Sequence, residues 1–141
     1  MRFNVEERSE SLLKSYLQPA LSGFTIHAGF SGDTVKERPC IAIICPDVKE
    51  TVPGSSVFTA TMAIEVRTRI AKDADKASIS AIIDAVRTAL QIKGITAALD
   101  AVDPSTRVHG VVLAEAQTEP EGQDRVWTQA LDIIWSHRDE Q

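Results

Sequence analysis

The sequence predicts an α+β domain in which two main helices cover one face of a mostly antiparallel sheet of about five strands. Two segments carry apolar residues at helical spacing, and five carry the alternation or the β-branched runs typical of strands. Turn signals separate these segments, and their order along the chain is α-β-β-β-α-β-β. We find no internal repeat and expect residues 1–141 to form a single domain.

The first helix is expected to begin after Asn4, a good capping residue, with Glu7 three positions later as in a capping box. Because Pro19 removes a backbone donor, the helix either stops near Gln18 or kinks in its last turn. The stretch Phe24 to Phe30 alternates in the manner of a half-buried strand. The apolar stripe that faces the core consists of Leu12, Leu13, Tyr16, Leu17, Ala20 and Leu21.

The middle of the chain predicts two strands, a buried one from Cys40 to Cys45 and a long one from Val57 to Ile70. Residues 46–56 between them contain two prolines, a glycine and mixed charges without any period, so we expect a mobile loop. Asp73 or Asp75 is a candidate cap for the second helix, which Gly94 is expected to end. The apolar stripe of that helix consists of Ile79, Ile82, Ile83, Val86 and Leu90.

A short helical turn from Ile95 to Val102 is expected next, and the chain then closes with strands at Val108 to Thr118 and Asp124 to Ser136. Residues 119–123 form a hairpin-length connection with a glycine, so these strands should pair antiparallel, and residues 137–141 are expected to be a frayed tail. The last strand carries both tryptophans on one face, eight positions apart. They are either core residues or anchors for a partner subunit.

Composition excludes several classes of protein. A net charge of −5, with no basic block, argues against binding through nucleic-acid phosphates or anionic lipid headgroups. No apolar run approaches the roughly 20 residues of a membrane helix, and residues 1–10 are too charged for a signal peptide. We therefore expect a protein without membrane contact that matures in a reducing cytoplasm.

No catalytic, cofactor or metal site is predicted, and we expect the protein not to be an enzyme. Cys40 and Cys45 lie on opposite strand faces about 16 Å apart, too far for the 7 Å or so of a disulfide, and are interpreted as packed small residues. A nucleophilic Cys45 is the alternative. Three histidines, His27, His109 and His137, lack zinc-ligand spacing. Ser55 and Ser56 lack the context of a nucleophile elbow, and no phosphate-binding glycine motif occurs.

Charged residues on the long strand are the most suggestive group. Its period places Phe58, Met62, Ile64 and Val66 toward the helices and Glu65, Arg67 and Arg69 on the opposite, wet face. This group is either a solvated face or part of a subunit boundary. Because exposed ion pairs contribute only about 0 to 1 kcal/mol, Arg67→Glu is expected to change the unfolding stability little while weakening assembly.

The order of elements resembles the tail terminator, or tail-completion, proteins of long-tailed bacteriophages and prophages. The likeness extends from Leu12 to Ser136. The likeness rests on the opening helix, the strand that ends in proline, and the loop after that strand. It also rests on three later segments, FTATMAIEVRTR (58–69), AIIDAVRTAL (81–90) and WTQALDIIW (127–135).

The resemblance implies an assembly protein of the virion neck without catalysis or cofactors, present in the host cytoplasm during assembly. It implies a homo-oligomeric ring, a hexamer, that caps the tail tube protein, ends tail elongation and docks head-completion proteins, while DNA passes through the lumen without specific binding. The expected subunit or tail-tube interface consists of Glu65, Arg67, Arg69, Asp47, Lys49 and Glu50. The alternative is a small cytosolic oligomeric enzyme or ligand-binding subunit with a site at the subunit interface.

Overall fold

The computed structural model describes residues 5–36, 39–69 and 74–138. Its helices and strands confirm the predicted α+β class and the order α-β-β-β-α-β-β. In chain order the elements are α1 (Val5–Leu17), the 3₁₀ turn η1 (Gln18–Leu21), β1 (Ile26–Ala28), the 3₁₀ turn η2 (Gly32–Thr34), β2 (Cys40–Glu50), β3 (Val57–Arg69), α2 (Ala74–Leu90), α3 (Ile95–Asp100), β4 (Thr106–Glu121) and β5 (Asp124–His137).

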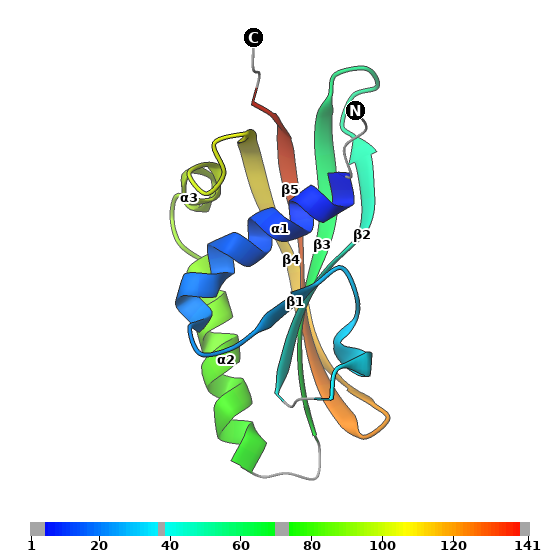
Figure 1. The fold of residues 1–141 in the computed structure, drawn as a ribbon, viewed down its shortest axis with the longest axis vertical. Helices are drawn as coiled ribbons and strands as arrows, with labels where there is room; N and C mark the ends of the chain where they lie inside the picture. Colours follow the sequence, from blue (N-terminus) through cyan, green and yellow to red (C-terminus); the bar gives the residue numbers. More distant parts are fainter. Residues whose placement is uncertain (1–4, 37–38, 70–73, 139–141) are drawn as a thin grey trace.

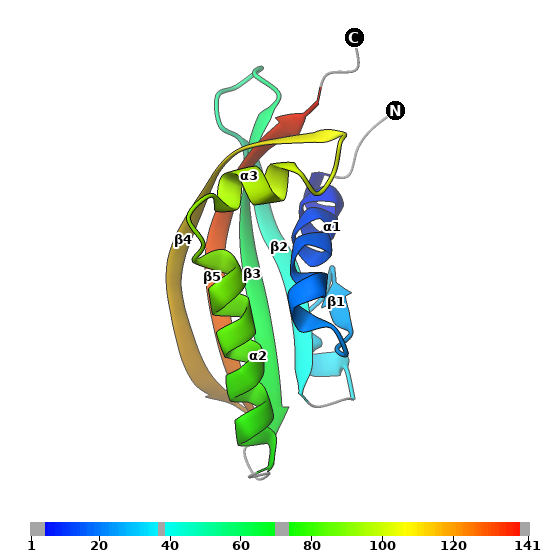
Figure 2. The same ribbon diagram turned by 90° about the vertical axis from the view of Figure 1, so that its left-hand side faces the viewer.

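The five strands form one sheet in the order β1-β2-β3-β5-β4. Only the short β1 pairs in parallel, with β2, and the other neighbours are antiparallel. The helices lie on one face of this sheet (Figures 1 and 2). Figure 1 also shows the β2–β3 turn at one end of the sheet and the β4–β5 turn at the other, so the two turns are far apart.

The core lies between the sheet and the helices. Trp135 is fully buried, and its indole Nε1 donates a hydrogen bond of 2.8 Å to Ser9 Oγ of α1. Trp127 is 6% exposed. Both tryptophans are therefore core residues of this chain. The α1 and α2 side chains packed with them include Leu12, Leu13, Leu17, Ile79, Ile82, Val86 and Leu90.

The predicted loop at residues 46–56 is wrong in its first half, because β2 continues to Glu50. A register shift between Ile44 and Asp47 places Pro46 in a β-bulge, where its missing N–H costs no ladder hydrogen bond. Pairing with β3 then resumes, with Lys49 opposite Thr59. Only residues 51–56 form the turn, and its mobility stays a prediction.

Other element ends shift by a few residues. The strand expected from Phe24 to Phe30 contains only Ile26–Ala28, and Phe24 and Phe30 are exposed. Helix α2 ends at Leu90, and Gly94, with φ of +109°, lies at the start of α3 instead of directly after α2. In the expected frayed tail, His137 belongs to β5, and the Arg138 backbone N–H donates to Ser105 O at 2.8 Å. Asn4, Asp73 and residues 139–141 lie outside the described residues.

Candidate functional site

The charged group predicted on β3 forms an ion-pair cluster within the chain. Arg67 is 2% exposed, which overturns the expectation that its side chain is solvated. Its guanidinium lies 3.2 Å from Glu65 Oε1, 3.0 Å from Glu121 Oε1 and 3.5 Å from Asp124 Oδ2. Arg69 Nε lies 3.7 Å from Asp124 Oδ1. The cluster joins the end of β3 to the β4–β5 turn.

Burial of Arg67 comes from η2, a segment far from β3 in the sequence. Ser31 Oγ accepts a hydrogen bond from the Arg67 guanidinium at 3.1 Å. A Cβ at Gly32 would meet Cys40 Sγ at 2.8 Å and Arg67 Cδ at 3.3 Å, so only glycine lets η2 lie this close. Burial favours a lower pKa for Arg67, but hydrogen bonds and charge from Glu121 and Glu65 outweigh it and raise the pKa. Arg67 is thus a structural cation.

Asp47, Lys49 and Glu50, the other predicted interface residues, lie at the opposite end of the sheet. Lys49 pairs with Thr59, whereas Arg67 pairs with Cys40 at the far end of the same two strands. All three side chains are exposed, and Glu50 Oε2 accepts a hydrogen bond from the Ser56 backbone N–H at 2.9 Å. The six predicted residues therefore form two separate groups. An interface role for either group stays a prediction.

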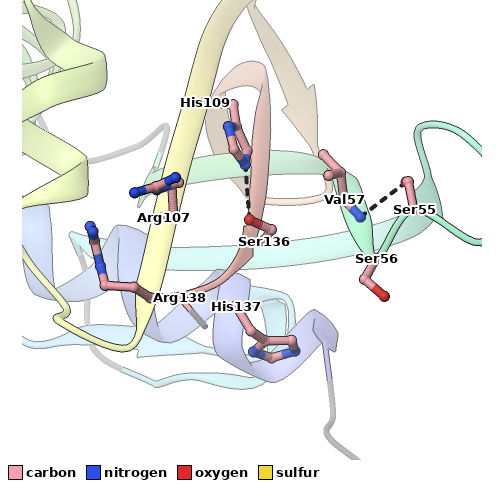
Figure 3. Close-up of a pocket in the computed structure, with 8 residues that line it drawn as sticks. All are labelled: Ser55, Ser56, Val57, Arg107, His109, Ser136, His137 and Arg138. Carbon is pink, nitrogen blue, oxygen red and sulfur yellow. Dashed lines mark hydrogen bonds between the residues drawn. The ribbon is translucent and has the colours of Figure 1, made fainter. Parts of the chain in front are cut away.

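A basic cavity of about 570 Å³ lies at the same end of the sheet as the β2–β3 turn (Figure 3). Histidine and arginine side chains line it together with serine hydroxyls, and no carboxylate among the described residues does so. Sequence analysis missed this site because its residues come from three separate segments. They are Ser55, Ser56, Val57, Arg107, His109, Ser136, His137 and Arg138.

Three interactions hold the residues around the cavity in place. Arg138 lies 3.1 Å from both carboxylate oxygens of Asp100, and Asp100 Oδ1 also accepts the Val108 backbone N–H at 2.8 Å. The Val108 hydrogen bond is the largest cause of the lowered pKa of Asp100. His109 Nε2 and Ser136 Oγ are hydrogen bonded at 2.9 Å, and Ser136 lies between its strand partners Arg107 and Val57 (Figure 3). Asp100 thus compensates the charge of Arg138, and Arg107 is the lining arginine whose guanidinium stays available to a carboxylate or another anion.

Beyond the cavity, β4 is an exposed edge strand. Every residue from 112 to 121 is exposed, including Val112 at 56% and Leu113 at 37%. Register shifts between Val108 and Gly110 and between Leu113 and Ala116 interrupt its pairing with β5. Large exposed apolar side chains on an edge strand are typical of a surface that a partner covers.

Cys40 and Cys45 are buried and unbridged, on opposite faces as predicted. Burial, followed by the charge of Glu10, raises the pKa of Cys45 to about 12. A thiol with such a pKa stays protonated at neutral pH and is a poor nucleophile. The geometry therefore favours the interpretation of Cys45 as a packed side chain.

Within residues 5–36, 39–69 and 74–138, no three histidine, cysteine or acidic side chains gather in a way that would hold a metal ion. No helix in the same ranges has the length and apolar character needed to cross a membrane.

Comparison with known proteins identifies a shared fold. No family model matches the chain, and no curated protein matches its sequence. A chain of the virion of a native gene transfer agent particle has a similar structure, with a TM-score of 0.57 and 14% sequence identity. The match covers 93% of this chain and 92% of that chain. At this identity the likeness concerns the fold alone.

Proposed function

We propose that this chain is a structural component of a phage-like virion and that, within the virion, it is a tail terminator. The observation that carries the proposal is the likeness to a gene transfer agent virion chain, which covers nearly the whole of both chains. Because the match covers nearly all of both chains, the two chains share a whole fold and not only one motif. The element order, which resembles that of tail terminators, supports the finer assignment.

In this role copies of the chain form a ring, a hexamer, that caps the tail tube protein and ends elongation. The exposed edge strand β4 supports an oligomer, because it leaves apolar side chains uncovered in the single chain. The ring's outer end then receives the head-completion protein. Asp47, Lys49 and Glu50, next to the 51–56 turn, are the exposed group that we assign to the contact with the tail tube or a neighbouring subunit.

Passage of DNA through such a ring requires weak contact with phosphates. The chain has a net charge of −5, and the two arginines of β3 are held by carboxylates of the same chain. Neither feature favours tight phosphate binding. Both support a lumen through which DNA slides without specific contacts.

The alternative of an enzyme or ligand-binding subunit loses its main support at Cys45. That alternative depended on a reactive thiol beside Pro46, and the thiol is buried with a raised pKa. We therefore retain the virion role as the proposed function.

Deletion of the gene from the strain that makes the particle tests this role. A tail terminator is required to stop tube growth, so its loss should give tails of uncontrolled length without attached heads. The full chain supplied in trans should restore normal tails, and a variant with the core change Leu13→Asp should not. Tails of normal length with heads attached, in the absence of the chain, would contradict the proposed function.

A further inference from the structure

Strand β4 has unpaired charges of opposite sign toward its two ends. The side chains of Arg107 and Glu119 are both exposed, and neither forms a hydrogen bond or ion pair with another residue that the structure describes, although the charge of Arg107 contributes to the lowered pKa of Asp100. Their partners on β5, Ser136 and Val126, are ten residues apart, which corresponds to roughly 33 Å along a strand. The two charges therefore cannot neutralise each other within one chain.

Both charges lie on the same face of the sheet. Arg107 pairs with Ser136 and Glu119 pairs with Val126, and both of these β5 positions alternate with the buried tryptophans. The two side chains thus belong to the face that the helices do not cover. Arg125, which pairs with Pro120, lies on the other face and does not compensate Glu119.

The surroundings of the two charges differ. Arg107 belongs to the basic cavity with His109 and Arg138, where no described carboxylate is part of the lining. Between Arg107 and Glu119 on this face lies the exposed side chain of Val112, which pairs with Asp132, whereas Leu113 pairs with Leu131 and lies on the helix side. On this face of β4, the recess around Arg107, the exposed Val112 and the acidic Glu119 thus follow one another along a single strand.

We propose that a second copy of this chain docks head to tail on this surface, with Glu119 of one copy entering the basic cavity around Arg107 of the next. The inference deepens the proposed ring and rests on it. A head-to-tail contact leaves each copy with one free cavity and one free acidic end, so the contact can repeat, and it gives a ring when the rotation between successive copies closes. The bulges and Pro120 disfavour simple extension of the sheet across the β4 edge, so side-chain contacts carry the docking.

Cysteine pairing tests the geometry on the full chain. The variant Arg107→Cys with Glu119→Cys should, on oxidation, give a ladder of disulfide-linked species that extends beyond the dimer. Cys40 and Cys45 are buried and do not compete. The matched control, Arg87→Cys with Glu119→Cys, places one thiol on the exposed side of α2 and should give little ladder. A ladder that stops at the dimer, or one equally strong in the control, would overturn the docking mode.

Charge exchange tests the chemistry. Arg107→Glu or Glu119→Arg alone should weaken self-association about tenfold or more at low salt, measured by sedimentation of the full chain. An equal mixture of the two variants should recover association, because each supplies the charge that the other needs. Unchanged single variants, or a mixture that fails to recover, would overturn the inference.

Imaging of wild-type particles separates this failure from failure of the proposed function. If both experiments fail while a ring of wild-type chains is seen at the tail end, only the docking mode is wrong. If no ring is present there, the proposed function itself is wrong.

Discussion

The carboxylate of Glu10 accepts a hydrogen bond from the backbone N–H of Cys45 at 2.8 Å. Cys45 lies in the β-bulge of β2, so its N–H has no partner in the ladder with β3. Glu10 is only 7% exposed and thus ties α1 to the bulge from within the core. Burial, the largest cause, raises the pKa of Glu10 above the usual value of a carboxyl group.

We predict that the Glu10→Gln variant becomes more stable relative to the wild type as pH rises. A carboxyl group whose folded pKa is raised stabilises the fold fully below its unfolded pKa, and this contribution is lost as pH rises through the folded pKa. Glutamine keeps an acceptor for the Cys45 N–H but has no proton to lose. Urea unfolding between about pH 4 and about pH 7 should show the variant gaining on the wild type.

The exposed Ser11 of the same helix provides the control. Ser11→Ala removes no titratable group, so its stability relative to the wild type should not change with pH over the same range. If Glu10→Gln instead loses stability relative to the wild type as pH rises, the Glu10 carboxylate is not penalised by burial and the account of this contact is wrong.

Removal of the Arg67 cation should destabilise the subunit strongly. Arg67→Met leaves the carboxylates of Glu65 and Asp124, whose side chains are 14% and 12% exposed, without their central partner. Breaking a buried ion pair in this way costs about 3 to 5 kcal/mol. Arg69→Met, at a 39% exposed side chain, should cost only about 0 to 1 kcal/mol in the same urea titration. Equal effects would mean that the cluster is not a buried network.

The Ser9 hydroxyl should matter more than other serines of α1. Ser9→Ala leaves the buried Trp135 indole N–H without an acceptor, which costs about 1 to 3 kcal/mol. Ser11→Ala, on the exposed side of the same helix, should change the free energy of unfolding by no more than about 0.5 kcal/mol. Tryptophan fluorescence follows both unfolding transitions, and a neutral Ser9→Ala would refute the importance of this hydrogen bond.

Asp100 should give a pH dependence opposite to that of Glu10. The hydrogen bond from the Val108 N–H, and then the charge of Arg138, lower the pKa of Asp100. The ionised Asp100 therefore stabilises the fold above the usual carboxyl pKa, and this stabilisation is lost as pH falls through the folded pKa. Asp100→Asn should therefore be less stable than the wild type near neutral pH, and the difference should shrink on acidification. A difference that stays constant with pH would show that the carboxylate charge is irrelevant there.

Much of the fold could be predicted because strand period and helical spacing are local properties. The alternation predicts that Trp127 and Trp135 share one face, and the odd offset of Cys40 and Cys45 predicts opposite faces. Whether the tryptophans face the core or a partner subunit stayed open in the sequence, and the structure places both in the core. The antiparallel pairing of the last two strands followed from the short glycine-containing connection.

The features that could not be predicted depend on contacts between distant segments. Burial of Arg67 needs η2, more than thirty residues earlier, and the continuation of β2 past Pro46 needs the bulge that Glu10 supports. The basic cavity combines the 51–56 turn with the start of β4 and the end of β5. None of these juxtapositions leaves a periodic signal in the sequence.

In the proposed function, copies of this chain form a ring at the end of the tail tube. Electron cryomicroscopy of the neck of native particles can show this ring, with the chain located by fitting its sheet and helices into the map. The account predicts a closed ring of copies, six in number, between the tail tube and the head-completion protein. A neck without the chain, or one that holds it as a single copy, would contradict the account.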